Sequence, residues 1–390
     1  MQFIDLQKAY RRIQPEASAA VEKVLLSGRY IGGEEVEAFA EELGRWMGVR
    51  HVIPVANGTD ALQVALMAAG FRPGDEILVP SFTYVASVEA IVLLGLKPVL
   101  VDVDEDTFCT TPELLEKGLS SRTRGLIPVH LFGQACPMAD VLAFARRYGL
   151  ICIEDNAQSM GASYLSADSA ASAGEMRDMD SSAPLREIRT GTESHLSCTS
   201  FFPTKNLACM GDGGAITTND SALARRALQM ARHGQAERYR HETIGCNSRL
   251  DALQAALLRI RLRHLDEYIA RRKAVAERYC EELDGLPGVR LPLPALSTPG
   301  HSYNQYTLRV EGGAARRDAL AAYLREQGVP TMIYYPLPIH RQPAYREYAP
   351  AYPLPVSERL CTEVLSLPVH PELTEEEQGF IIQTLLNWKG

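Results

Sequence analysis

Ile151-Cys-Ile-Glu-Asp155-Asn-Ala-Gln158 reads as a short apolar strand that ends in a carboxylate. Similar apolar strands lie on both sides of it and alternate with helical patterns. We expect these strands at residues 52–56, 76–80, 98–103, 125–129, 150–154, 197–202 and 214–218. The alternation predicts an α/β fold with a mainly parallel sheet sandwiched by helices, and places function in loops beyond the carboxyl ends of the strands.

A lysine follows the acidic strand end at a distance of fifty residues, in Ser200-Phe-Phe-Pro-Thr-Lys205-Asn-Leu207. Apolar residues precede it and the glycine cluster Gly211–Gly214 follows it, so we place it on a loop between apolar strands. An amine that can form an imine, together with a carboxylate that can hold a pyridine nitrogen protonated, is the minimum equipment for pyridoxal phosphate (PLP) chemistry. We interpret Lys205 as that amine and Asp155 as that carboxylate.

A phosphate-binding segment is expected at Asn57-Gly58-Thr59-Asp60, where a short strand ends and an amphipathic run begins. Small residues at the start of a helix expose unpaired backbone N–H groups, and the helix dipole adds partial positive charge there. The alternative interpretation is an ordinary N-cap. Ser200, five residues before the lysine, supplies a candidate hydroxyl for the same phosphate.

An aromatic side chain is expected to stack on the cofactor ring and restrain its tilt. Tyr84, in Pro80-Ser-Phe-Thr-Tyr-Val85 after the strand at 76–80, is the candidate. Phe82 competes with it, and a core role is open for either residue.

Six motifs occur in order along nearly the whole chain and resemble those of the DegT/StrS-type nucleotide-sugar aminotransferases. They are Asn57-Gly-Thr-Asp-Ala-Leu62, Pro80-Ser-Phe-Thr-Tyr84, Glu154-Asp-Asn-Ala-Gln158, Ser200-Phe-Phe-Pro-Thr-Lys-Asn206, Gly211-Asp-Gly-Gly-Ala215 and Gly245-Cys-Asn-Ser-Arg-Leu-Asp251. The resemblance implies a PLP-dependent transferase of fold type I, like aspartate aminotransferase, with a small C-terminal α+β domain. It also implies an obligate homodimer with active sites at the interface.

Matched position by position, the resemblance assigns roles to individual residues. It implies that Lys205 binds the cofactor as a Schiff base, Asp155 meets the pyridine nitrogen, Gln158 lies near the ring oxygen and Tyr84 stacks on the ring. The phosphate would be held by Gly58, Thr59 and Ser200, with Asn247 reaching over from the other subunit.

Within that family, residues 231–254 are most similar to the UDP-2-acetamido-3-keto-glucuronate aminotransferases of O-antigen assembly. Those enzymes place an amine, usually from glutamate, at C3 of the sugar. Arg249 would then face the sugar carboxylate or the diphosphate; the alternative is a salt bridge with Asp251 at the start of a helix. His233 is a candidate substrate contact or a structural histidine. Tyr334 replaces the histidine of the family's common His-Tyr-Pro, which leaves the sugar open, and Tyr335 is a further candidate substrate contact.

Rival functions remain open beside this interpretation. A dTDP-linked 3-keto- or 4-keto-6-deoxyhexose is the alternative substrate. A sugar dehydratase of the same fold would carry a histidine where Lys205 stands, and a non-catalytic regulatory protein could retain the fold.

Composition predicts a cytoplasmic enzyme. The chain has 390 residues and a formal net charge of −8, which argues against a nucleic-acid binder. No apolar run approaches the roughly 20 residues of a membrane helix, and residues 1–5 lack a signal-peptide pattern. The eight cysteines show no Cys-x-x-Cys pair, and the nine histidines no His-x-x-x-His, so we expect neither a metal site nor a disulfide framework.

Two domains are expected, an N-terminal arm with the large PLP-binding domain at 1–248, and a linking helix with a small domain at 249–390. We expect helices over 1–50 with an arm-like Gly28–Gly33, a helix starting after Thr111, and a long helix from Arg249 to Glu282. The small domain is expected to hold a strand at 303–310, a helix at 314–326, a strand near 329–333 and a last helix from about 374. Residues 165–195 are polar and lack periodicity, which predicts a flexible insertion, either a lid or a surface loop.

Overall fold

A seven-stranded sheet forms the centre of the computed structural model, which describes residues 1–166, 185–292 and 298–390. In spatial order the strands are β1 (His51–Val55), β9 (Gly214–Thr218), β8 (Leu196–Ser200), β5 (Ile151–Asp155), β4 (Thr123–Leu126), β2 (Glu76–Pro80) and β3 (Lys97–Val101). Only β9 pairs antiparallel with its neighbours, β1 and β8, and every other pair is parallel. The expected mainly parallel sheet is therefore confirmed, and the ends of its strands lie within three residues of the predicted ones.

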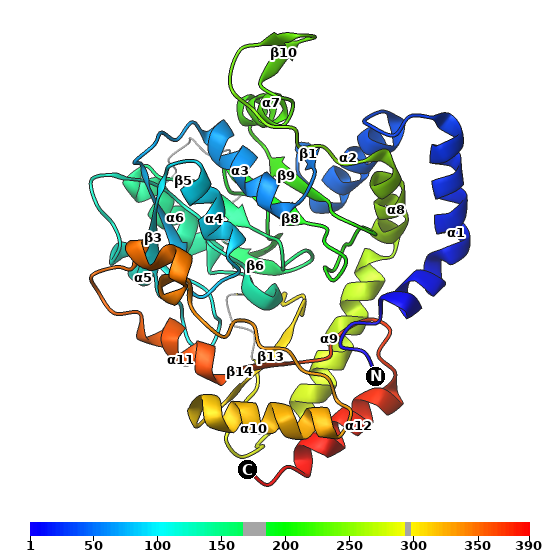
Figure 1. Cartoon of the computed structure of the whole chain (residues 1–390), viewed down its shortest axis with the longest axis vertical. Coiled ribbons are helices and arrows are strands. Elements are labelled where there is room, and N and C mark those ends of the chain that lie inside the picture. Colours follow the sequence, from blue (N-terminus) through cyan, green and yellow to red (C-terminus); the bar gives the residue numbers. More distant parts are fainter. Residues whose placement is uncertain (167–184, 293–297) are drawn as a thin grey trace.

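Helices cover both faces of this sheet, as the alternation of strands and helices predicted (Figure 1). On one face the strands pack against α3 (Gly58–Ala69), α4 (Ala86–Leu93) and α7 (Ser221–Met230). The other face packs against α5 (Pro112–Glu116) and α6 (Met138–Tyr148) at the β3 end, and α2 (Glu34–Met47) and α8 (Ala252–Arg263) at the β1 end. Because side chains alternate along a strand, Ile77 and Val79 enter one core and Leu78 the other.

The N-terminal segment is helical, as expected. The helix α1 (Leu6–Ser27) packs against α8 and ends at Gly28, whose left-handed φ of 67° closes the helix. The arm that follows leaves Tyr30 and Ile31 exposed, and the Tyr30 carbonyl accepts a hydrogen bond from the Ala252 N–H at the start of α8.

Helical residues from 252 onward form two elements rather than the one long helix expected from Arg249. His264, where φ is −103° and ψ is 1°, lies between them as the C-cap of α8 and the N-cap of α9 (Leu265–Glu282). α8 packs on α1 and α2, whereas α9 contacts α12 (Glu375–Leu386). The division between residues 248 and 249 stays a prediction.

The C-terminal part holds an antiparallel sheet of β12 (Val289–Arg290), β13 (Tyr306–Val310) and β14 (Val364–Leu367), packed against α9, α10 (Gly313–Glu326) and α12. The predicted strand near 329–333 is wrong: Met332 makes only an isolated bridge to Ser366, and Pro330 offers no N–H for a ladder. The helix α11 (Pro355–Glu363) and the strand β14 were not predicted from the sequence.

The predicted insertion at 165–195 contains regular structure at both ends. The strand β6 (Ser163–Ser166) pairs antiparallel with β7 (Arg186–Arg189), so the expectation of a loop throughout is wrong for these residues. Residues 167–184 lie outside the described part, and the lid or surface-loop role falls on them. Within the described ranges, no helix combines the length and apolarity needed to cross a bilayer.

Candidate active site

Asp155 ends the central strand β5 and is nearly inaccessible to solvent, with 6% of its surface exposed. One carboxylate oxygen, Oδ2, accepts a hydrogen bond from the Ser87 hydroxyl at 2.7 Å, and Oδ1 accepts one from the Ala157 N–H at 3.1 Å. A carboxylate offers about four acceptor positions, so this side chain is fixed and still able to accept a further N–H. Those are the properties needed to hold a protonated ring nitrogen.

Lys205 lies in the turn between β8 and β9, where its N–H donates to the Phe202 carbonyl at 2.9 Å. Its side chain is partly buried. Burial lowers the pKa of the amine to about 8, and the negative charge of Asp155 opposes that shift. A lysine in this environment is a nucleophile near neutral pH, as the sequence interpretation requires.

The start of α3 is both an N-cap and a close meeting point with β8. The Asn57 side chain accepts a hydrogen bond from the Asp60 N–H at 2.8 Å, so the N-cap interpretation is confirmed. A Cβ atom added to Gly58 would lie 2.6 Å from the Ser200 Cβ, which means that only glycine allows this approach. The structure thus brings Ser200 beside the helix start, where the N–H groups of Gly58 and Thr59 have no partner within the helix.

Tyr84 and Phe82 occupy different environments, which separates the two candidates for ring stacking. Phe82 is 1% exposed and packs edge-on against Phe132 in the core. Tyr84 is 56% exposed and lies 6.0 Å from the Tyr335 ring, centroid to centroid. Tyr84 is therefore the ring that a ligand can reach.

Gln158 is held between two partners. Its Oε1 accepts a hydrogen bond from the Phe132 N–H at 2.8 Å, and its Nε2 donates to the Tyr335 hydroxyl at 3.1 Å. Burial raises the pKa of Tyr335, so its hydroxyl stays protonated at neutral pH. Tyr335 is thus placed at the site, whereas the half-buried Tyr334 makes an edge contact with Phe3.

The remaining predicted site residues lie near the hairpin of β10 (Gln235–Glu237) and β11 (Arg240–His241), which projects from the molecule (Figure 1). The backbone of Asn247 forms an isolated antiparallel β-bridge with that of Arg232. The His233 N–H donates to the Cys246 carbonyl at 2.8 Å. Arg249 is exposed, and within the described ranges it forms no ion pair with Asp251. Within the described ranges, no hydrogen bond or ion pair joins these three predicted residues to Lys205.

One contact in the centre of the site was not foreseen from the sequence. Ser87 is buried on α4 and donates to Asp155, but a serine in an apolar helix carries no signal of that role. Its partner lies 68 residues away in the chain, so only the fold reveals the pair.

The family model for the DegT/DnrJ/EryC1/StrS aminotransferases matches residues 11–386. The chain belongs to this family. A UDP-2-acetamido-2-deoxy-3-oxo-D-glucuronate aminotransferase of Pseudomonas aeruginosa is 42% identical over 387 residues, which are 99% of this chain and 100% of the relative. A dTDP-3-amino-3,4,6-trideoxy-alpha-D-glucose transaminase of Streptomyces venezuelae is 41% identical over 99% of this chain and 95% of its own length. The solved structure of S. venezuelae DesV with a ketimine intermediate superposes with a TM-score of 0.90, at 41% identity, over 99% of this chain and 98% of that one.

Membership in this aminotransferase family establishes a fold type I transaminase that uses pyridoxal phosphate. The site fits that cofactor on three independent observations: the remaining acceptor capacity of Asp155, the lowered pKa of Lys205, and the glycine-dependent approach of Ser200 to the α3 helix start. The substrate is a sugar nucleotide in the named relatives, but the nucleotide differs between them.

Proposed function

We propose that the protein transfers an amino group from L-glutamate to C3 of UDP-2-acetamido-2-deoxy-3-keto-glucuronate, in the cytoplasm, for O-antigen or other cell-surface polysaccharide synthesis. The observation that carries the choice of sugar is the end-to-end likeness to the P. aeruginosa relative, which acts by its name on a 3-oxo-glucuronate. Arg249 supports it, because an exposed guanidinium without an ion pair to Asp251 is free to meet a carboxylate.

The chemistry divides between the cofactor and the chain. Bound pyridoxal phosphate supplies an aldehyde for the amine and a ring that withdraws electrons from the reacting carbon. Asp155 would hold the ring nitrogen protonated, Gln158 the ring oxygen, and Tyr84 the face of the ring. The phosphate would be held by Gly58, Thr59 and Ser200 of one subunit and by Asn247 of the other.

Lys205 moves the protons in this proposal. Its amine removes the proton from the α-carbon of glutamate, and water supplies the carbonyl oxygen with which 2-oxoglutarate leaves, so that the nitrogen stays behind on the enzyme. In the second half-reaction the keto oxygen of the sugar leaves as water, and the same amine delivers a proton to C3 of the sugar, which leaves with the amino group. Tyr334, Tyr335 and His233 are proposed to contact substrate.

A homodimer with shared active sites is part of the proposal. Large apolar side chains are exposed on the arm and beside the lysine turn, among them Ile31, Phe202 and Met210. The exposure of Asn247 also fits a residue that serves a partner subunit. Mixing Lys205→Ala with Asn247→Ala subunits tests this directly, because a shared site should regain about a quarter of the wild-type activity in the mixture. Two inactive proteins that stay inactive after exchange would refute shared sites.

The substrate is tested by presenting a panel of 3-keto and 4-keto sugar nucleotides to the pyridoxamine form of the enzyme. We expect the UDP-linked 3-keto-uronate to be aminated fastest. A dTDP-linked 3-keto-6-deoxyhexose is the second candidate, favoured by the 41% identity to the S. venezuelae transaminase. Preference for a 4-keto sugar would contradict both.

Arg249→Ala sharpens the test of the sugar. Loss of a charge-assisted hydrogen bond should lower kcat/KM for the uronate by roughly 10- to 100-fold and leave neutral sugars within about threefold. Arg325→Ala is the matched control, since Arg325 is an exposed arginine in the last turn of α10. An equal loss on uronate and neutral sugars would show that Arg249 does not read the carboxylate.

A further inference from the structure

Two separate loops carry the aromatic rings of the site. Tyr84 follows the strand β2, and Tyr335 lies in the segment that leads from α10 to α11. The rings meet at 6.0 Å, although the two residues are far apart in the chain. Their relative position therefore depends on what joins the two loops.

A serine and a histidine join the two loops. Ser81 lies three residues before Tyr84, and His340 lies five residues after Tyr335. The Ile339 N–H donates to the Ser81 carbonyl at 2.9 Å, and the Ser81 hydroxyl lies 2.7 Å from His340 Nδ1. Ser81 is fully buried and His340 is 7% exposed, so water does not compete for this bond.

Both ring nitrogens of His340 have hydrogen-bond partners. A carboxylate oxygen accepts, so Nε2 carries a hydrogen and donates it to Glu358 Oε1 at 3.0 Å. With its hydrogen on Nε2, the neutral ring presents Nδ1 as an acceptor for the Ser81 hydroxyl, and Ser81 Oγ also accepts from the backbone N–H of His340 at 3.3 Å.

Glu358 is fixed in turn by its own partners. The Arg341 guanidinium donates to Glu358 Oε1 through Nε at 2.9 Å and Nη2 at 2.6 Å. The helix α11 that carries Glu358 is anchored at its start, because the buried Asp102 accepts hydrogen bonds from the Val356 and Ser357 N–H groups. Ser81, His340 and Glu358 therefore form a continuous chain of hydrogen bonds from the end of β2 to α11.

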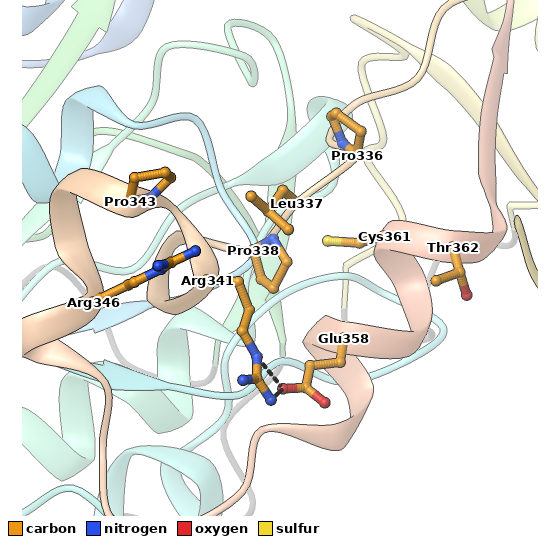
Figure 2. Close-up of a pocket in the computed structure, with 9 residues that line it drawn as sticks. All are labelled: Pro336, Leu337, Pro338, Arg341, Pro343, Arg346, Glu358, Cys361 and Thr362. Carbon is orange, nitrogen blue, oxygen red and sulfur yellow. Dashed lines mark hydrogen bonds and ion pairs between the residues drawn. The ribbon is translucent and has the colours of Figure 1, made fainter.

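The far side of the Tyr335–His340 segment is open. Figure 2 shows the pocket there, with Pro336, Leu337 and Pro338 on its wall and Arg341 bound to Glu358 at its edge. The cavity measures about 480 Å³. Side chains that face a cavity lose packing contacts on that side. The position of the Tyr335–His340 segment therefore depends on the buried Ile339 and on the hydrogen bonds of His340 to Ser81 and Glu358.

We propose that His340 is a positioning residue of the transaminase, which sets Tyr335 against Tyr84 and Gln158 by binding Ser81. The inference rests on the proposed aminotransferase reaction but not on which nucleotide sugar is used. It is tested on the holoenzyme in the glutamate half-reaction, which needs no sugar.

Ser81→Ala removes the central bond, and Ser221→Ala is its matched control. Ser221 Oγ makes the same type of contact with His51 Nε2, at 2.9 Å, on an exposed part of the chain. We expect Ser81→Ala to slow the glutamate half-reaction on the order of tenfold, as misplacement of a positioned group does, and Ser221→Ala to stay within about twofold. Deuterium uptake in residues 333–341 should rise in Ser81→Ala alone, even without cofactor.

A pair of histidine replacements tests which ring nitrogen of His340 carries the effect. The amide of Asn reaches the place of Nδ1 and that of Gln the place of Nε2, so His340→Asn should keep the bond to Ser81 and His340→Gln should lose it. We expect Asn to retain at least about threefold more activity than Gln, at similar thermal unfolding midpoints. This comparison also decides the matter if Ser81→Ala fails to fold.

Equal activity of the two histidine variants, or unchanged uptake and rate in Ser81→Ala, would overturn the proposal. A wild-type enzyme that glutamate fails to convert would instead contradict the proposed donor, which keeps the two failures distinct.

Discussion

The titration of Lys205 offers the sharpest test of the site. Burial lowers the pKa of its amine from the ordinary 10.5 to about 8, although Asp155 acts in the opposite direction. A shift of that size corresponds to about 3 kcal/mol between the charged and neutral forms. At pH 7 roughly a tenth of the amine would then be free, about 300-fold more than for an ordinary lysine.

The sign of the Asp155 effect gives the perturbation. A negative charge favours the ammonium form, so Asp155→Asn should move the Lys205 pKa below 8, not above it. Protonation of Lys205 on lowering the pH below its pKa removes the nucleophile. Cofactor capture by the apoenzyme should therefore rise with pH through about 8 in the wild type.

Trace acetylation of the apoenzyme at a series of pH values, followed by peptide mass spectrometry, measures each lysine in the same sample. Lys23 is the internal control, because its hydrogen bond to Glu35 raises its pKa above the ordinary value. We expect the acetylation rate of Lys205 to reach half of its maximum near pH 8, and that of Lys23 to do so at a higher pH. If the two lysines had the same midpoint, or if the pKa of Lys205 rose in Asp155→Asn, the conclusion that burial lowers the pKa of Lys205 would be refuted.

Two further substitutions test the cofactor cradle and the ring contacts. Gly58→Ala places a methyl group 2.6 Å from the Ser200 Cβ, so PLP affinity should fall by about 1–3 kcal/mol in an equilibrium titration. Gly379→Ala in α12, where the new methyl group would meet only a guanidinium tip at 3.4 Å, should leave that affinity unchanged. Tyr335→Phe leaves Gln158 Nε2 without its acceptor and should lower the free energy of unfolding in urea by about 1 kcal/mol; no loss would show that water replaces the hydroxyl.

The sheet was largely predictable because buried parallel strands are short apolar runs with clear ends. Ile151–Asp155 and Glu76–Pro80 show this, since a carboxylate ends the first, and a carboxylate and a proline bound the second. The C-terminal part was harder. The apolar Val329 favoured a strand near 329–333, but it packs at the end of α10 and Pro330 prevents ladder pairing.

Candidate residues for the reaction were predictable where the chemistry demands a rare combination. Lys205 and Asp155 are recognisable as an amine in a loop between apolar strands and a carboxylate at a strand end, and the negative charge of Asp155 acts on the pKa of Lys205. Ser81 and His340 were not, because a buried pair 259 residues apart leaves no periodicity or spacing in the sequence. The choice between Tyr84 and Phe82 likewise required burial, which an aromatic pair in one loop does not reveal.

The parts of the chain proposed to hold the cofactor differ from those proposed to choose the sugar. Asp155 ends the buried strand β5, and Lys205 lies in the turn that joins the buried strands β8 and β9, where a shift of strand register would disrupt the sheet. Arg249 and His233 lie in exposed segments, where side chains can change at little cost to stability. Relatives of 42% and 41% identity act, by their names, on different nucleotide sugars, which agrees with the proposal that exposed segments choose the sugar. It follows that exchanging the exposed segment 231–249 for that of a dTDP-sugar transaminase should alter sugar preference while leaving the glutamate half-reaction intact.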